Sequence, residues 1–149
     1  MNKNEYKQSV SQAYLIEPLP LEKNRILIVD DEKLVRDVFK LVLSYGLPKC
    51  KTDFAVNGAE AIESFRAIHQ GVILMDLMMP VMDGETAFDE IQKICRTNNW
   101  EMPSVVFCTG YVPTDKIKNT VKDNTSHCLL QKPVSNDVLI KAINIRLAA

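Results

Sequence analysis

Residues 73–84, ILMDLMMPVMDG, carry the strongest fold signal in the chain. An apolar run that begins at Val72 ends in one carboxylate, Asp76, and a methionine-rich loop with a proline, a second acid and a glycine follows. Short apolar runs that are bounded by turn residues are typical of strands buried on both faces. The stretch therefore predicts a buried strand over residues 72–75 that places Asp76 at its carboxyl end.

Similar apolar runs occur on both sides of this stretch. They predict strands at residues 26–29, 52–56, 104–108 and 128–130, and helical spacing predicts helices within residues 34–45, 57–68, 87–95, 114–122 and 135–147. Asn57 and Ser135 are expected to cap two of these helices. Strands that alternate with helices and lack polar alternation indicate a parallel sheet covered on both faces. With right-handed crossovers, this pattern predicts an α/β fold of flavodoxin-like type, a single doubly wound five-stranded parallel sheet with strand order 2-1-3-4-5.

The composition fits one ordinary domain. The chain has 149 residues, of which 46% are hydrophobic and 25% charged, and its formal net charge is -1. So small a net charge provides no overall field that would attract nucleic acid or an anionic membrane, and no apolar run approaches the roughly 20 residues that span a bilayer. Four cysteines without a C-x-x-C pair, and an amino terminus without an apolar signal core, predict reduced thiols in a cytoplasmic protein. Residues 1–23 are interpreted as a tail or linker and residues 24–149 as the domain.

Polar residues follow four of the five predicted strands. Asp30 and Asp31 follow the first, Asp76 the third, Thr109 ends the fourth, and Lys132 follows the fifth. In doubly wound sheets, ligands bind beyond the carboxyl ends of the strands. In the order 2-1-3-4-5 these four strands are contiguous, so we expect the five side chains to converge on one rim.

Three crowded carboxylates raise one another's pKa unless something neutralises them, and a divalent cation does so. Magnesium prefers a few carboxylate oxygens together with water in an octahedral arrangement. We therefore expect Mg2+ at this rim, with Asp31 and Asp76 as direct ligands. Asp30 is expected to act through a water molecule, and the backbone carbonyl near Met78 to complete the protein's share.

Phosphoryl transfer fits the remaining groups at the rim. Its transition state spreads negative charge over three oxygens, which Mg2+, the Lys132 ammonium and the Thr109 hydroxyl can each meet. An unclaimed oxygen of Asp76 is then available as a nucleophile, so Asp76 is predicted to become an acyl phosphate. A cis bond before Pro133 would turn Lys132 toward the site. Taken singly, each of these residues also fits an ordinary structural role, and the prediction depends on their combination.

Four motifs carry a resemblance to a known family. The stretches ILIVDDEKLVR, ILMDLMMPVMDG, VVFCTGY and LLQKP resemble, in order, those of the receiver domain of two-component response regulators, the CheY-like superfamily, over about residues 24–147. The resemblance implies that a histidine kinase or a histidine phosphotransfer protein donates a phosphoryl group to Asp76, that Mg2+ is required, and that a downstream protein receives the signal. It implies a phosphoacceptor with self-phosphotransfer and autodephosphorylation only, and no other enzymatic activity.

Two residues depart from the family pattern. Leu129 stands where receivers usually carry Phe or Tyr, and Gly110 follows Thr109 where alanine is common. Tyr111 is a candidate to replace the missing switch aromatic. The sparse apolar residues of 114–122 predict a weakly anchored helix, so the face formed by residues 111–147 is expected to change on phosphorylation, to meet partners and to offer a surface for a homodimer.

Several alternatives remain at the level of sequence. The chain could be a receiver that serves as an unphosphorylated docking module, or a fragment of a larger regulator or hybrid histidine kinase. If the chain is complete, its end at Ala149 leaves protein contacts as the route of output. A flavodoxin-like electron carrier shares the predicted architecture, but the acidic turn after the first strand would repel a flavin phosphate. A magnesium-dependent phosphatase with an aspartyl nucleophile is a further alternative, but the spacing of the acids does not suit it.

Overall fold

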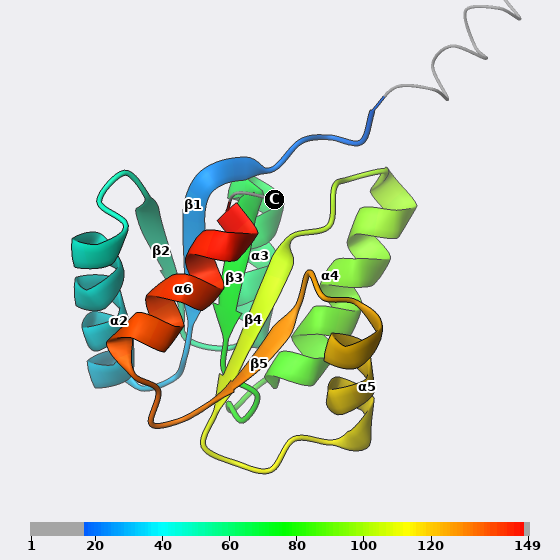
Figure 1. Ribbon diagram of the computed structural model, residues 1–149. Helices are drawn as coiled ribbons and strands as arrows, with labels where there is room; N and C mark the ends of the chain where they lie inside the picture. Colours follow the sequence, from blue (N-terminus) through cyan, green and yellow to red (C-terminus); the bar gives the residue numbers. More distant parts are fainter. Residues whose placement is uncertain (1–16, 148–149) are drawn as a thin grey trace, which may run out of the picture.

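The computed structural model describes residues 17–147 (Figure 1). Their strands and helices alternate along the chain. In chain order, the elements are β1 (Glu22–Val29), α2 (Lys33–Gly46), β2 (Lys51–Ala55), α3 (Gly58–Ile68), β3 (Gln70–Met75), α4 (Gly84–Asn98), β4 (Ser104–Thr109), α5 (Asp115–Asp123), β5 (Cys128–Gln131) and α6 (Asn136–Leu147). Each predicted strand and helix is present, with boundaries that shift by a few residues.

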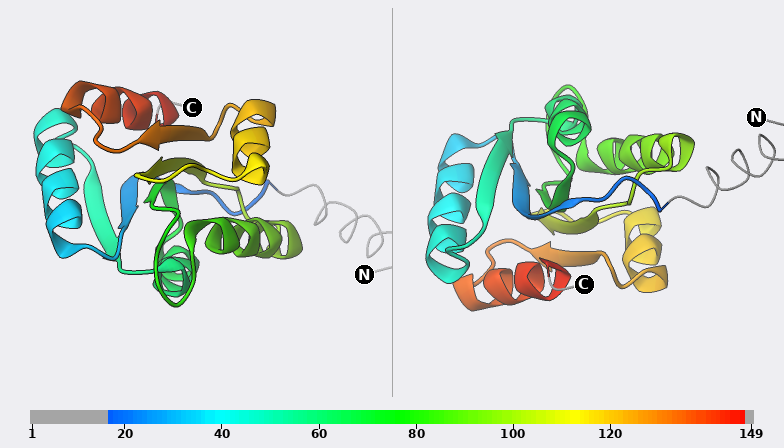
Figure 2. Two further views of the ribbon diagram at one scale, coloured as in Figure 1. Left: turned by 90° about the horizontal axis from the view of Figure 1, so that it is seen from below. Right: turned by 90° about the horizontal axis from the view of Figure 1, so that it is seen from above.

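The sheet has the order β2-β1-β3-β4-β5 and all of its pairings are parallel, which confirms the predicted topology. Helices α2 and α6 cover one face, α3 and α4 cover the other, and α5 lies beside the β5 edge (Figures 1 and 2). This arrangement follows from right-handed crossovers that change direction at β1. It brings the carboxyl ends of β1 and β3, which are remote in sequence, side by side.

The core consists of two apolar layers, one on each face of the sheet. Odd-numbered strand residues such as Leu27 and Ile73 pack with α3 and α4, whereas even-numbered residues such as Ile28 and Leu74 pack with α2 and α6. All six residues of β3 are buried. Complete burial of a large aliphatic side chain contributes about 1.5–3 kcal/mol, so the central strands fix the geometry of whatever follows them.

Short side chains cap the helices. The Asn57 carboxamide accepts a hydrogen bond from the backbone N–H of Glu60 at 2.9 Å, and the Ser135 hydroxyl accepts one from Val138 at 3.3 Å, so both predicted caps are confirmed. The start of α4 is capped by Asp83, which accepts from the Thr86 N–H at 2.8 Å. This cap fixes where α4 begins relative to the loop that follows Asp76.

The amino-terminal boundary differs from the sequence interpretation. Strand β1 begins at Glu22, inside the predicted tail of residues 1–23, and Leu19 forms a parallel bridge with Trp100. The Leu19 N–H donates to the Asn99 carbonyl at 3.1 Å, and the Glu101 N–H donates to the Leu19 carbonyl at 3.0 Å. Residues 1–16 of the predicted tail lie outside the described residues.

No helix in the range 17–147 is long and apolar enough to cross a membrane.

Candidate functional site

The predicted site residues extend the sheet by one residue at the ends of its strands. The backbone N–H of Asp30 donates to the last carbonyl of β2 at 3.2 Å, and that of Asp76 donates to the last carbonyl of β1 at 3.0 Å. The N–H of Lys132 donates to the carbonyl of Thr109, the last residue of β4, at 2.8 Å. Because these backbones are held in register with the sheet, their side chains meet at one rim.

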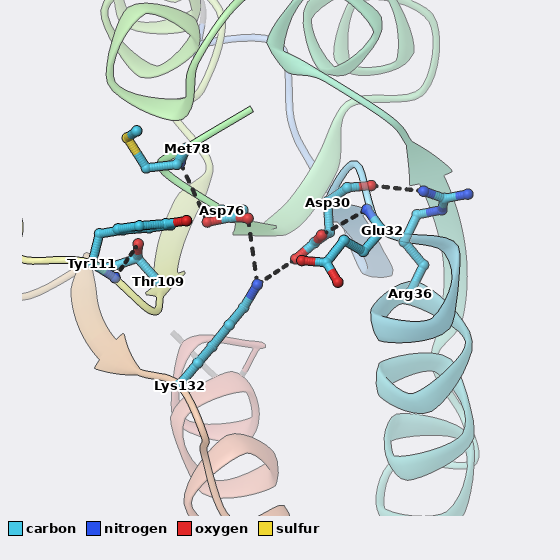
Figure 3. A network of polar contacts seen from close by, with 8 residues as sticks. All are labelled: Asp30, Glu32, Arg36, Asp76, Met78, Thr109, Tyr111 and Lys132. Carbon is cyan, nitrogen blue, oxygen red and sulfur yellow. Dashed lines mark hydrogen bonds and ion pairs between the residues drawn. The ribbon is translucent and has the colours of Figure 1, made fainter. Parts of the chain in front are cut away.

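Lys132 joins the two buried carboxylates of this rim. Its Nζ lies 2.6 Å from Asp30 Oδ2 and 3.4 Å from Asp76 Oδ2 (Figure 3). Asp30 is 1% exposed and Asp76 is 7% exposed. The peptide bond between Lys132 and Pro133 is cis. The two Nζ distances place the lysine between the acids that follow β1 and β3.

The two carboxylates differ in how firmly they are held. Besides Lys132, Asp30 accepts a hydrogen bond from the Glu32 N–H at 2.9 Å, and the Arg36 guanidinium donates to the Asp30 carbonyl at 2.8 Å. Asp76 has only long contacts, from the Met78 N–H at 3.3 Å and from Lys132 at 3.4 Å. Asp76 is thus the less constrained of the two acids. Sequence reasoning gave no role to Arg36.

For both Asp76 and Lys132, burial and nearby charges shift the pKa in opposite directions. Burial raises the pKa of Asp76, and the nearby Lys132 ammonium opposes this shift. Burial by itself would lower the pKa of Lys132, but the hydrogen bond from Lys132 to Asp30 and the charges of both acids outweigh it, so the pKa of Lys132 is raised. Lys132 is therefore a fixed positive charge at neutral pH.

The donor set of the rim fits a hard divalent cation. Carboxylate oxygens of Asp30, Asp31 and Glu32 lie within 4.8 Å of one another. Asp76 is outside this group and is linked to it through Lys132. The three aspartates and one lysine leave two negative charges unbalanced, and oxygen ligands of this kind suit Mg2+. Glu32, which the sequence analysis did not name as a ligand, thus lies close to two of the predicted ligands, Asp30 and Asp31.

Thr109, Leu129 and Tyr111 differ in burial. Thr109 is buried at the end of β4, and its hydroxyl accepts a hydrogen bond from the Tyr111 N–H at 3.2 Å. The Tyr111 side chain is 64% exposed, beside Met78 (Figure 3). Leu129, by contrast, is half-buried opposite Phe107 and packs against the core. The predicted aromatic position is therefore filled by a packed aliphatic side chain, and the available aromatic ring lies on the surface.

The loop after Asp76 folds back onto the strand end. The Gly84 N–H donates to the Leu77 carbonyl at 3.0 Å, and a Cβ on Gly84 would lie 2.1 Å from the Asp76 carbonyl oxygen. Only glycine fits so close an approach, which explains the residue that ends the ILMDLMMPVMDG stretch. Val81 in the same loop has a φ of 69°, a strained conformation for a β-branched residue. Nothing in the apolar pattern indicated this strain.

The strand order and the acidic rim together define the receiver class of signalling domain. The family model described as "Response regulator receiver domain" matches residues 26–144, and the chain belongs to this family. Such domains act in two-component signal transduction with histidine kinases and downstream effectors, generally bind Mg2+ at their acidic pocket, and are generally not enzymes. Family membership leaves the electron-carrier and phosphatase alternatives without support.

Relatives of the chain vary widely in length. The chain is 40% identical to the regulatory protein AtoC of Escherichia coli over 92 residues, which cover 62% of this chain and 18% of AtoC. It is 32% identical to protein PilH of Pseudomonas aeruginosa over 83% of this chain and 98% of PilH. The signal receiver domain of a LuxO repressor protein from Vibrio parahaemolyticus shares the fold, with a TM-score of 0.71 at 22% identity, over 89% of this chain and 92% of that domain. The chain thus spans about a fifth of AtoC and nearly all of PilH.

Proposed function

We propose that Asp76 accepts a phosphoryl group from the phosphohistidine of a histidine kinase or a histidine phosphotransfer protein. The observation that carries the proposal is the arrangement of Asp76, which is buried at a strand end and whose carboxylate accepts only long hydrogen bonds, from the Met78 N–H at 3.3 Å and from Lys132 at 3.4 Å. An Asp76 oxygen attacks the phosphorus, the new P–O bond forms, and the P–N bond breaks with its electron pair returning to the imidazole. Water later attacks the same phosphorus, the bond between phosphorus and the Asp76 oxygen breaks, and inorganic phosphate leaves, which restores the carboxylate.

The residues of the rim divide the remaining tasks. Asp31 and Asp76 would hold Mg2+ directly, with Asp30 through water and with the Met78 carbonyl, and the ion would neutralise charge that develops on the phosphoryl oxygens. Lys132 contributes a second positive charge as a flexible point donor. Thr109 donates its hydroxyl to a phosphoryl oxygen once it turns away from the Tyr111 N–H. Together these contacts would stabilise the negative charge that the phosphoryl oxygens carry in the transition state.

Helix α2 offers a surface for the phosphodonor. Leu34, Val38, Leu41 and Tyr45 are exposed at helical spacing, so they form one apolar stripe along the helix. Beside this stripe, Leu34 and Val38 line an apolar groove of about 450 Å³ that reaches Lys132 and Pro133. A partner helix that covers this stripe would bring its phosphohistidine close to Asp76. In this proposal the face of residues 111–147 carries the output, to a downstream protein or to a second copy of the chain, and the protein acts in the cytoplasm.

The test is incubation of the full chain with acetyl phosphate and Mg2+, followed by intact mass measurement. We expect a single phosphoryl increment that disappears in Asp76→Ala and in the presence of a chelator. Asp89→Ala is the matched control, because it removes an acid of the adjacent helix α4 that lies outside the rim and caps no helix, and it should keep the increment. If the wild-type chain gains no mass, the docking-only receiver becomes the better account, and the packed Leu129 in place of an aromatic residue is the observation that favours it.

A further inference from the structure

Helix α5 is attached to α4 by polar contacts between side chains. The Thr114 hydroxyl donates to Glu85 Oε1 at 2.8 Å, and Lys116 forms an ion pair with Asp89. Ile117 is the one fully buried residue of α5. Since few apolar contacts hold this helix, its polar contacts determine much of its position relative to α4.

The Thr114 contact lies beside the rim. A cavity of about 100 Å³ separates the loop after Asp76 from residues 109–114, and Met78, Glu85, Thr109 and Thr114 all line it. Thr109 and Thr114 are the two ends of the segment that connects β4 to α5. Any movement of Thr109 toward Asp76 therefore changes the shape of a cavity that the Glu85 and Thr114 side chains also line.

Glu85 is fixed relative to the phosphoacceptor. It follows Gly84, which touches the Asp76 backbone so closely that no side chain fits, and α4 is capped there by Asp83. Thr114 has two roles, because its hydroxyl oxygen also accepts the Ile117 N–H at 3.2 Å and so caps α5. The hydrogen bond between Glu85 and Thr114, named here the Glu85–Thr114 link, thus joins the rigid acceptor side to the far end of the connecting segment.

We propose that the Glu85–Thr114 link holds residues 110–114 in the resting arrangement and sets how readily a phosphoryl group on Asp76 draws Thr109 inward. This inference rests on the proposed phosphoacceptor function. It identifies Glu85 and Thr114 as positioning residues, and it gives a route of coupling that does not need an aromatic side chain at Leu129. A hydrogen bond that is present only in the resting state stabilises that state. Its removal shifts the equilibrium toward the switched state, and by linkage it raises the affinity for the phosphoryl group by the same factor.

The experiment uses beryllium fluoride with Mg2+ as the phosphoryl mimic on the full chain. Calorimetry gives the affinity of the mimic, and hydrogen exchange gives the protection of residues 110–117. Glu85→Ala should bind the mimic about threefold more tightly and should exchange about threefold faster in this segment without the mimic, because one partly exposed hydrogen bond is lost. Glu85→Gln keeps an acceptor oxygen and should behave like the wild type, which separates the bond from the effect of removing a negative charge.

Asp89→Ala is the matched control. It also removes an acid of α4 that contacts the first turn of α5, but Asp89 does not line the cavity. We expect its affinity for the mimic to equal that of the wild type. Equal gains in Glu85→Ala and Glu85→Gln, an equal gain in Asp89→Ala, or weaker binding in Glu85→Ala would each overturn the inference. The exchange comparison needs no mimic, so failure of the mimic to bind the wild type would count against the phosphoacceptor function and leave the link to be judged by exchange.

Discussion

At the scale of single residues, one backbone N–H of the sheet is satisfied by a side chain and not by a backbone carbonyl. His127, just before β5, is buried, and its Nδ1 accepts the backbone N–H of Val105 at 3.0 Å. The imidazole therefore replaces a carbonyl at the start of the β4–β5 pairing, and it can do so only when Nδ1 carries no proton. Burial, with a smaller contribution from the Arg146 charge, lowers the pKa of His127 to about 4.

This pKa leads to a dependence of stability on pH. In the unfolded chain the histidine takes up a proton near pH 6.5, whereas in the folded chain it resists protonation until about pH 4. The unfolded state thus binds more protons between these values, so stability is lost as the pH falls from 6.5 to 4, by up to about 3 kcal/mol. Urea unfolding across this range should show the loss in the wild type and a smaller loss in His127→Gln. Identical pH profiles for the two proteins would contradict this account.

At the scale of elements, helix α2 has two apolar sides. Phe39 and Leu43 face the sheet and are buried, while the stripe of Leu34, Val38, Leu41 and Tyr45 faces outward. Folding of the domain does not require apolar residues on the outer side of this helix, so the stripe is available to the partner proposed above. Its position beside Lys132 and Pro133 suits a partner that must reach the acidic rim.

The stripe can be tested with Leu41→Asp. Leu41 is 72% exposed, so the free energy of unfolding should change by no more than about 0.5 kcal/mol. Phosphotransfer from a purified histidine kinase or phosphotransfer protein should slow by at least about fivefold, because a charge then faces the apolar partner. Uptake from acetyl phosphate should not change. Val138→Asp, on α6 and outside the groove, is the control, and equal slowing in both variants would argue against α2 as the docking helix.

The elements themselves were largely predictable from the sequence, and the exceptions have physical reasons. Central strands such as residues 72–75 are buried on both faces, so their apolar runs are uninterrupted and easy to recognise. The start of β1 at Glu22 could not be predicted, since residues 22–25 are polar and exposed or half-buried. They join the sheet only through neighbouring strands, Glu22 opposite Gln70 of β3 and Arg25 opposite Lys51 of β2. The outward stripe of α2 could not be predicted from the helical spacing within residues 34–45, because spacing alone does not distinguish the buried side of a helix from an exposed apolar side.

At the scale of the whole molecule, strand order is what makes the site. Asp30, Asp76, Thr109 and Lys132 lie at or just after the ends of four contiguous strands, and the strand order alone is enough to predict that they share one rim. The contacts made by Glu32, Arg36 and the Glu85–Thr114 link were not predicted. These depend on side-chain conformations between segments distant in sequence, for which periodicity carries no information.

Binding of Mg2+ to the assembled rim should stabilise the whole domain. The rim exists only in the folded chain, so Mg2+ at 100 times its dissociation constant should raise the free energy of unfolding by about 2.7 kcal/mol. Urea unfolding with increasing MgCl2 at constant ionic strength measures this effect. Asp31→Asn should require much more Mg2+ for the same stabilisation. Asp37→Asn, an exposed acid of α2 paired with Lys33, should respond like the wild type, and an unchanged response in Asp31→Asn would remove Asp31 from the ligand set.

Trp100, which forms the backbone bridge with Leu19, also provides an intrinsic fluorescence signal. Trp100 is the only tryptophan in the chain, and its indole lies against His69, with ring centroids 4.5 Å apart, and near Phe65. It precedes β4, at the end of the parallel sheet opposite Asp76. Its fluorescence emission should therefore follow denaturation of the domain while remaining insensitive to phosphorylation, so that one unlabelled sample can report fold integrity independently of signalling state.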